Sequence, residues 1–556
     1  MPGKHGISQP LCISRRAADC REKMFASGIT NTCILNRVIN PIQTAKKKPS
    51  MKTKKIHILL LIALAFGSKS STRYVQAASL VVDSLADTVT TDGHCTLREA
   101  ILNANNNVAT NVDCAAGSGA DTITFSVSGT ITLGSGLPMI NDTAGLTIDG
   151  SEQSVTISGN DKVHIITVVS LVPLTLNHLT IANGNTVGYG GGGIENYGSL
   201  TIIDSIFSNN NNPENHGGAI YNQSGTLNVT DSIFSGNNAK KRGGGIYSLG
   251  GIVNISSSSF SSNTAFEGGA IYSYDCNLTI TDNSSFSVNN TPNGSGGGIY
   301  NIYGPLIIAD STFTTNGASW GSGGGGIYNE VGLLTITNSI FSGNSATGSH
   351  GGGIYNDAMM NISKSTFSGN SAGTGGAIVN EGDNATIANS TFSANNASAN
   401  GDNGGGIYNT GILIVTNNTL SGNSVPGSGG GIGNIGGTLT LRNTIVANNP
   451  GGNCRGTITN GGNNLDDGTT CGWGSASGSM SSTNPLLGDL TGTPAYFLLN
   501  SMSPAIDKGD DSICTAWPVS NQSQNGVARP QGAHCDIGSY EYDVHFYRNY
   551  LPLATQ

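Results

Sequence analysis

Charged side chains, aromatic side chains and long apolar runs are all scarce in this sequence. Only 11% of its 556 residues are charged and 6% are aromatic, whereas glycine occurs 81 times. There is no Cys-x-x-Cys pair, and the nine histidines form no cluster with metal-ligand spacing, which argues against a zinc or redox centre. A single apolar run stands out, and it lies close to the N-terminus.

That run has the features of an export signal. The basic stretch Lys52–Lys55 precedes an apolar core, Ile56–Gly67, and the small-x-small site Val75–Ala77 follows. This order is typical of a secretory signal peptide, and the core of about a dozen residues is too short to span a bilayer. We therefore expect translation to start at Met51, a signal peptide over 51–77 and a non-native extension over 1–50. A membrane anchor is the alternative reading.

Removing residues 1–77 makes the remaining chain strongly acidic. It keeps 11 Lys and Arg against 32 Asp and Glu, a net charge near −21 instead of −9. Such a surface argues against nucleic acid and anionic lipid as partners. Neutral glycans, cations and other proteins stay open, and we expect no transmembrane span in the mature chain.

Ten copies of one short pattern occupy residues 191–448. Each copy opens with Gly-Gly-Gly/Ala-Ile, and successive isoleucines are 24 to 29 residues apart. The isoleucines are Ile194, Ile220, Ile246, Ile271, Ile299, Ile327, Ile354, Ile378, Ile407 and Ile432. This period is too short for a propeller blade, and short alternating runs such as Leu334–Ile336 indicate strands rather than helices.

A second anchor, Phe-x-x-Asn, follows the isoleucine in each copy. Its first positions are Phe207, Phe234, Phe260, Phe286, Phe313, Phe341, Phe367, Phe392, Leu420 and Ile445. The asparagines are Asn210, Asn237, Asn263, Asn289, Asn316, Asn344, Asn370, Asn395, Asn423 and Asn448. Three short strands per copy predict one coil of a parallel β-helix, in which the Phe side chains stack inside and the Asn amides bond along the axis. We expect these asparagines to take the left-handed conformation.

A tyrosine follows the repeat isoleucine in most copies. These residues are Tyr221, Tyr247, Tyr272, Tyr300, Tyr328 and Tyr355 on six consecutive coils, and Tyr408 later. Because side chains alternate along a strand, an inward Ile predicts an outward Tyr. Two interpretations stand: tyrosine is there because it suits a half-buried strand face, or an open tyrosine stripe binds sugar or protein, which makes these residues the candidate ligand-binding site.

Six of the seven cysteines after residue 77 form close pairs near the two ends. The predicted local disulfides are Cys95–Cys114, Cys454–Cys471 and Cys514–Cys535, and Cys276 is left as a buried thiol. Next to the first pair, the capping-box pattern from Thr96 to Glu99 predicts a helix through about Asn105. Such a helix would cover the open end of the solenoid.

Three motifs resemble those of known families. Residues Cys95–Ile101 resemble the Cys-Ser-Leu-Arg-Glu-Ala motif that names an N-terminal domain (CSLREA) of exported bacterial β-helix proteins, with Thr96 in place of Ser. The repeats are similar to those of chlamydial polymorphic outer membrane proteins, which are surface adhesins. Motifs between Asn484 and Tyr542 resemble the choice-of-anchor Q domain, which implies surface anchoring.

Enzymatic β-helices need paired carboxylates or a Ca²⁺–carboxylate cluster with a base. Asp204 and Asp231, three residues before their Phe, are expected on neighbouring coils with nothing basic beside them. We therefore predict no catalytic residues and no bound metal, and read the two as solvated turn carboxylates. We expect no cofactor, although the acidic segment Asp507–Asp511 offers oxygen ligands for Ca²⁺ outside an EF-hand spacing.

Together these observations predict an all-β protein, a right-handed parallel β-helix of the pectin-lyase-like type. The expected order is a CSLREA-like cap over 78–120, the β-helix over 121–450, a choice-of-anchor Q-like domain over 451–545 and a tail over 546–556. The expected function is a non-catalytic adhesin or glycan-binding scaffold, exported to the cell surface or beyond, with outer membrane association conceivable. Its partner would be an extracellular glycan or a surface protein of a host or neighbouring cell. The alternatives are a polysaccharide lyase or glycoside hydrolase, and a structural filament.

Overall fold

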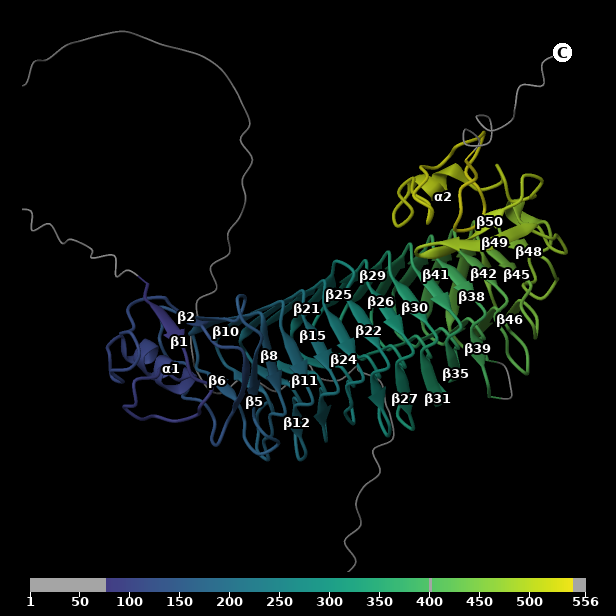
Figure 1. Ribbon diagram of the computed structural model, residues 1–556. Coiled ribbons are helices and arrows are strands. Elements are labelled where there is room, and N and C mark those ends of the chain that lie inside the picture. Colours follow the sequence, from purple (N-terminus) through teal and green to yellow (C-terminus); the bar gives the residue numbers. More distant parts are fainter. Residues whose placement is uncertain (1–76, 400–402, 544–556) are drawn as a thin grey trace, which may run out of the picture. The chain divides into compact units, whose positions relative to one another are not determined.

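The computed structural model describes residues 77–399 and 403–543, and the regular secondary structure of this part is mostly short parallel strands (Figure 1). The chain winds through three long sheets in turn, so that β13 (Ile220–Gln223), β14 (Thr226–Thr230) and β15 (Ile233–Ser235) form one coil. The predicted parallel β-helix is confirmed. Three predicted segments lie outside the described residues: the extension 1–50, the signal peptide 51–77 apart from Ala77, and the tail 546–556.

The three sheets hold 15, 14 and 12 strands, in this order of pairing. Sheet 1 contains β1 (Ser79–Val82), β2 (Asp121–Phe125), β4 (Leu146–Asp149), β7 (Pro173–Asn177), β10 (Ser199–Ile203), β14, β18 (Ile252–Ser256), β21 (Asn277–Thr281), β25 (Leu306–Ala309), β29 (Leu334–Thr337), β33 (Met360–Ser363), β37 (Ala385–Ala388), β41 (Ile412–Thr416), β44 (Thr438–Arg442) and β47 (Thr459–Asn460). Sheet 2 contains β3 (Gly129–Thr132), β5 (Val155–Ser158), β8 (Leu179–Ala182), β11 (Ile206–Ser208), β15, β19 (Ser259–Ser261), β22 (Ser285–Ser287), β26 (Thr312–Thr314), β30 (Ile340–Ser342), β34 (Thr366–Ser368), β38 (Thr391–Ser393), β42 (Thr419–Ser421), β45 (Ile445–Ala447) and β48 (Leu465–Asp466). Sheet 3 contains β6 (Ile166–Val168), β9 (Ile194–Asn196), β13, β17 (Ile246–Leu249), β20 (Ile271–Tyr274), β24 (Ile299–Ile302), β28 (Ile327–Asn329), β32 (Ile354–Asn356), β36 (Ile378–Asn380), β40 (Ile407–Asn409), β43 (Ile432–Asn434) and β46 (Cys454–Gly456).

Between sheets 2 and 3 the connecting segments form short strands of their own, which the sequence pattern did not indicate. They are β12 (Asn211–Asn212) with β16 (Asn238–Ala239), and β23 (Asn290–Thr291), β27 (Gly317–Ser319), β31 (Ser345–His350), β35 (Ser371–Thr374) and β39 (Asn396–Ala397). Small buried side chains such as Ala318 and Ala346 pair across neighbouring coils there. The loops of variable length follow these strands.

The interior of the solenoid is built from stacked identical residues. The phenylalanines from Phe207 to Phe392 are fully buried, and the centroids of successive rings lie 4.6 to 4.9 Å apart. The repeat isoleucines and the Leu and Ile residues of sheet 1 line the other walls, with almost no exposure. Because every coil places the same apolar residue over its neighbour, the core is one continuous column, and the ladder prediction is confirmed.

The predicted asparagine ladder is also present and fully buried. The Nδ2 of Asn289 donates to the Phe260 carbonyl and to Asn316 Oδ1, both at 2.9 Å, while its Oδ1 accepts from the amide of Asn263 at 3.0 Å. The expected left-handed conformation is wrong for nine of the ten asparagines, and Asn448 is the exception. In the other nine copies the residue before the asparagine takes it, as in Val288 with a φ of 57°.

The last repeat runs one residue out of the predicted register. Val446, not Ile445, pairs with Leu420 in the core row, and Asn449, not Asn448, accepts from Asn423. Ile445 faces outward but is fully buried, because residues of the C-terminal segment cover it. The sequence pattern is compatible with both registers. The C-terminal segment that covers Ile445 lies outside the repeat, so a single-repeat pattern could not indicate which register the chain adopts.

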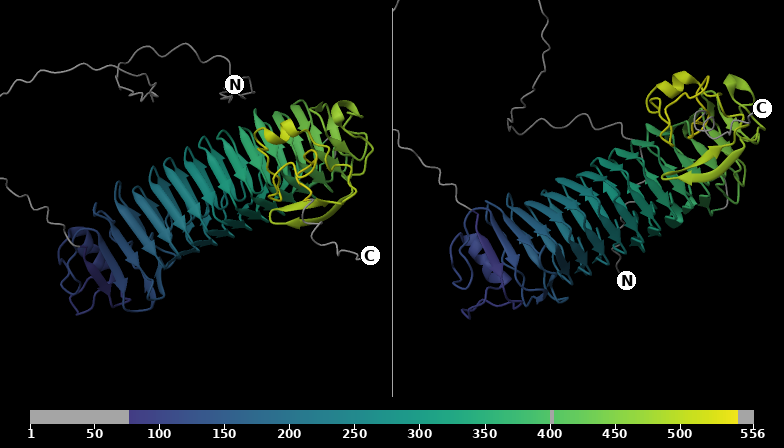
Figure 2. Two further views of the ribbon diagram at one scale, coloured as in Figure 1. Left: turned by 90° about the horizontal axis from the view of Figure 1, so that it is seen from above. Right: turned by 45° about the horizontal axis from the view of Figure 1, so that its top comes forward.

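The helix predicted at the N-terminal end is confirmed as α1 (Leu97–Asn106). The Thr96 side chain caps it, and the Thr96 backbone amide donates to the Glu99 carboxylate at 3.1 Å. Arg98 reaches from the helix to Asp87 at 2.8 Å and to the Gly136 carbonyl. These bonds fix α1 against the first coils (Figure 2).

At the other end the strands continue past the predicted boundary at residue 450, since β46, β47 and β48 add to sheets 3, 1 and 2. The C-terminal segment then folds back with the hairpin β49 (Leu487–Gly492) and β50 (Ala495–Leu499), after the 3₁₀ turn η1 (Ala476–Gly478), and with the short helix α2 (Asp511–Thr515). It lies on the outer side of sheet 2, where Thr366 Oγ1 donates to the Ala495 carbonyl at 2.6 Å and the Ser539 amide donates to Thr419 at 3.1 Å.

All three predicted disulfides are present, and the remaining thiol of the described part, Cys276, is buried. The bridges are Cys95–Cys114, Cys454–Cys471 and Cys514–Cys535. Each closes a loop of about twenty residues at one end of the array, so the covalent links reinforce the ends and leave the repeats unlinked.

Candidate functional site

The tyrosine ladder runs along the outer side of sheet 3 and comprises Tyr221, Tyr247, Tyr272, Tyr300, Tyr328 and Tyr355. Equivalent tyrosines pair in register across neighbouring coils, and successive ring centroids lie 4.6 to 5.4 Å apart. The rings form a cluster separate from the core that contains the repeat isoleucines. The predicted outward direction and stacking are therefore correct.

The expectation of an open stripe, on which the ligand-binding interpretation rests, is wrong. The six tyrosines are only 2% to 9% exposed, because neighbouring rings cover their faces and side chains from the connecting loops cover their edges. The His216 ring stacks on Tyr247 at 4.5 Å, and the Arg242 guanidinium, held by Glu267 at 2.7 Å, lies 4.8 Å from the Tyr272 ring centroid. Ligand binding by these tyrosines stays a prediction.

This burial also changes the acid–base chemistry of the ladder. Loss of hydration raises the pKa of Tyr221 and of Tyr328 to about 12. Loss of hydration, with the nearby charges of Arg242 and Lys241, lowers the pKa of His216 to about 4. The ladder is therefore protonated, and this histidine neutral, at neutral pH.

Beside the ladder lies a line of side chains three residues after the repeat isoleucine of the first eight copies, here named the outer row. All of its members except Ile302 are more accessible than the ladder. The outer row consists of Tyr197, Gln223, Leu249, Tyr274, Ile302, Glu330, Asp357 and Glu381. The first five coils carry aromatic, amide and apolar groups, whereas the last three carry carboxylates. Burial and then the charge of Glu381 raise the pKa of Asp357, and the Tyr300 hydroxyl donates a hydrogen bond to Glu330 Oε2 at 2.7 Å.

A second row lies at the corner between sheets 1 and 2, one residue per coil. It includes His178, Asp204, Asp231, Ser257, Asn283, Asp310, Asn338, Lys364, Asn389, Asn417 and Asn443, all with φ between 44° and 61°. The left-handed conformation favours Asn and Asp, so the chain geometry accounts for most of these residues. In the last repeat the corner residue is Asn443, not Arg442 as the predicted register had placed it.

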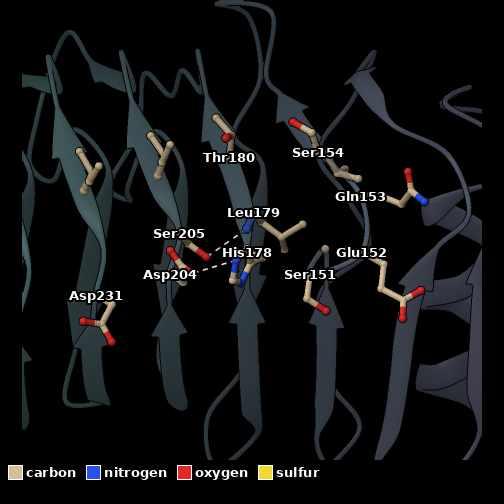
Figure 3. A pocket seen from close by; sticks show the side chains of 14 residues that line it. Ser151, Glu152, Gln153, Ser154, His178, Leu179, Thr180, Asp204, Ser205 and Asp231 are labelled. Carbon is tan, nitrogen blue, oxygen red and sulfur yellow. Dashed lines mark hydrogen bonds and ion pairs between the residues drawn. The ribbon is translucent and has the colours of Figure 1, made fainter.

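At its N-terminal end this corner carries a groove of about 430 Å³ (Figure 3). The loop 150–154, His178, Asp204 and Asp231 contribute to its lining, and Glu152 adds a third carboxylate. His178 Nε2 lies 2.7 Å from Asp204 Oδ2, and both side chains are about half exposed. An ion pair this exposed contributes little to stability.

The expectation that no basic group accompanies Asp204 is therefore wrong. His178 occupies the corner of the preceding coil, because Thr180 pairs with Ile206 and Ile181 with Phe207. That coil lacks the Gly-Gly-Ile and Phe-x-x-Asn signature, so the repeat pattern did not align it. The run Leu174–Leu176, which pairs with Leu200–Ile202 of the next coil, is a signal that could have placed this histidine, whereas Leu179–Ile181 belongs to sheet 2.

The groove can accept hydrogen bonds and hold a cation, but its chemistry is limited. The Asp231 carboxylate has no hydrogen-bonding or ionic partner among the described residues, and His178 is paired with Asp204. In the described ranges no group of three or more His, Cys, Asp or Glu side chains is arranged to hold a metal ion. The geometry brings together an imidazole and carboxylates without the compact cluster that β-helix hydrolysis or elimination requires.

The acidic segment Asp507–Asp511 uses several of its carboxylates within the fold. Asp510 caps α2 through the Ser512 amide at 2.8 Å, and Asp511 accepts from the Cys535 amide at 2.8 Å and pairs with His534. Coordination of Ca²⁺ by this segment stays a prediction.

Three short stretches match the repeat of the Chlamydia polymorphic membrane protein family, at residues 231–249, 257–274 and 364–381. Each stretch begins at a corner residue and ends at or beside the outer row. The match therefore spans the Phe-x-x-Asn and Gly-Gly-x-Ile elements of single coils. No curated protein matches the chain.

Among solved structures, the crystal structure of pectate lyase Pel9A is similar at 13% identity, with a TM-score of 0.26 over 84% of this chain and 97% of that one. A likeness at this level carries no information on activity or substrate. Within residues 77–399 and 403–543, no helix is long and apolar enough to cross a membrane.

Proposed function

We propose that this protein is an exported, cell-surface or extracellular β-helix that acts as an adhesin or glycan-binding scaffold without catalysis. The observation that carries the proposal is the tyrosine ladder with its outer row. A rigid line of aromatic, amide and carboxylate groups repeats once per coil along the outside of sheet 3. A repetitive surface of this kind suits a repetitive or extended partner.

The mode of contact follows from the burial of the ladder. Stacked rings present only edges to a ligand, so the half-exposed outer row would make most of the contact and the ladder would hold it rigid. Tyr and similar rigid side chains lose little conformational entropy on binding. The likeness of three coils to the Chlamydia polymorphic membrane protein repeat supports a role at a cell surface.

The rival function is a polysaccharide lyase or glycoside hydrolase. The groove with His178, Asp204 and Asp231 is the specific observation in its favour. Asp204 and Asp231 have the left-handed backbone conformation found at every position of the corner row, so the turn accounts for both residues. The paired side chains of His178 and Asp204 are also about half exposed to solvent. We therefore place binding ahead of catalysis.

One assay distinguishes the two functions. Purified protein is tested against a panel of soluble polysaccharides with and without Ca²⁺, and binding and new sugar ends are measured together. We expect binding without cleavage, weakened by Tyr300→Ala with Tyr328→Ala and unchanged by Ile252→Ala, an exposed residue on the outer side of sheet 1. Depolymerisation by wild type that is lost in Asp204→Asn would refute the scaffold function and support the enzymatic function.

A further inference from the structure

A hollow of about 850 Å³ lies where the tyrosine ladder ends, on the coils before Tyr221. In the ladder row, Tyr221 pairs with Glu195, and Glu195 pairs with Thr167. Both residues are smaller than tyrosine, so the row recedes there. The sequence pattern does not reveal the hollow, because Glu195 is simply a departure from tyrosine at this position in one of the ten copies.

The Glu195 carboxylate is held in place at the hollow. Thr167 Oγ1 lies 3.4 Å from Glu195 Oε2, and His164 Nε2 lies 2.9 Å from the same hydroxyl. His164 Nδ1 donates to the Gly191 carbonyl at 2.8 Å, which fixes the ring. The Glu195 carboxylate also lies against Gly190, where a Cβ would meet its Oε1. A carboxylate positioned in this way is a preorganised hydrogen-bond acceptor.

The aromatic group of the hollow differs from the ladder tyrosines. Tyr197 belongs to the outer row and is partly exposed, and it lines the hollow while packing against the ladder cluster. Burial and then the charge of Glu195 raise its pKa, which keeps the hydroxyl a donor. Leu171 and Met139, 87% and 61% exposed, add an apolar rim, and Gln223 adds an amide.

We propose that this hollow binds a residue of a non-acidic sugar, one whose hydroxyl groups donate to Glu195 while its apolar face lies on Tyr197. Few polar groups with fixed positions beside an aromatic and apolar lining are typical of small-ligand sites. The negative charge of Glu195 disfavours uronic acids, and neutral and amino sugars share the required hydroxyl chemistry. The inference rests on the proposed glycan-binding function and assigns it a defined subsite.

The test uses the whole protein and short oligosaccharides of three kinds: neutral cello-oligosaccharides, chitosan oligosaccharides and oligogalacturonates. Calorimetry compares wild type with Glu195→Gln, Tyr197→Ala and the exposed control Tyr303→Ala, after circular dichroism has verified folding. We expect wild type to bind a neutral or amino oligosaccharide, and each hollow variant to lose about tenfold or more in affinity. Tyr303→Ala should bind like wild type.

Preference for oligogalacturonate, or equal affinity in wild type and both hollow variants, would overturn the subsite. If Tyr300→Ala with Tyr328→Ala loses polysaccharide binding while both hollow variants keep it, the scaffold function stands and the hollow proposal fails. If wild type binds no sugar, the hollow proposal fails. Adhesion of protein-coated beads to cells then tests whether the protein is an adhesin that binds surface proteins.

Discussion

The asparagine ladder gives a prediction whose size can be worked out from single contacts. In Asn289→Ala, the Phe260 carbonyl loses the Asn289 Nδ2 donor, and the Asn263 amide loses the Oδ1 acceptor. The Asn263 side chain keeps its bond to the Phe234 carbonyl, and Asn316 Oδ1 keeps the Asn289 backbone amide. The Phe260 carbonyl still faces β22 in the strand ladder, so the Asn263 amide is the backbone group left buried without a partner.

An orphaned buried group costs about 1–3 kcal/mol, so the expected loss of unfolding free energy is about 2 kcal/mol. The matched control is Asn254→Ala. Its amide also bonds to an asparagine on the neighbouring coil, Asn228, at 2.9 Å, but both side chains lie at the surface. Because water replaces the lost partner there, the control should change stability by less than about 0.5 kcal/mol.

Urea unfolding followed by circular dichroism measures both variants against wild type. Hydrogen exchange with mass spectrometry adds a local test, since the Asn263 amide should exchange faster in Asn289→Ala before the whole array unfolds. A loss below about 1 kcal/mol, or equal effects of the two variants, would refute the view that the buried amides hold neighbouring coils together.

Three further predictions concern the backbone, the ends and the C-terminal segment. Gly325→Ala should destabilise the protein strongly, because the new Cβ would lie 2.4 Å from the Gly352 carbonyl oxygen and 2.5 Å from that of Ser345. In the control Gly188→Ala the new Cβ meets nothing within 4 Å, so this variant should unfold like wild type. Thermal unfolding compares the two variants. Cys95→Ser with Cys114→Ser should cost about 3 kcal/mol by urea unfolding, and an unchanged midpoint would contradict the stapling role. Burial and then the charge of Glu541 raise the pKa of Asp536 from 3.8 to about 7, so the folded protein binds this proton more tightly than the unfolded chain does. The contribution of this group to folding stability is therefore complete below pH 3.8 and is lost as the pH rises to about 7. Unfolding of wild type between pH 4 and pH 8 should show this decline, and Asp536→Asn should flatten it.

The sequence predicted the repeated part of this fold well because each coil repeats the same physical requirements. Phe260 has to fill the interior, and Asn263 has to satisfy backbone groups of the adjacent coil, so both recur at fixed spacing. The helix at Leu97 was also predictable, since the capping box is a local interaction. These features depend on neighbours that the repeat itself specifies.

The misses have the opposite cause, because they depend on contacts between unlike parts. Ile445 takes an outward position under the C-terminal segment, and no single-repeat pattern contains that segment. His178 lies in a coil without the repeat signature, although it meets Asp204 one coil away. The burial of Tyr272 comes from Arg242, a loop residue that alternation along a strand does not describe.

The corner row has a different neighbour at each end of the array. Near the N-terminal end it is open at the groove, while near the C-terminal end Lys364 donates to Gln522 and Asn443 donates to the Asp510 carbonyl. Within the described residues, the corner residues of the coils between these two regions have neighbouring coils as their partners. Insertion or deletion of one whole coil there would change the distance between the groove and the C-terminal segment by roughly 4.8 Å while both keep their own contacts. The middle of the array is thus a spacer of adjustable length, and the distance between its two ends is a property that recombination between repeats can tune.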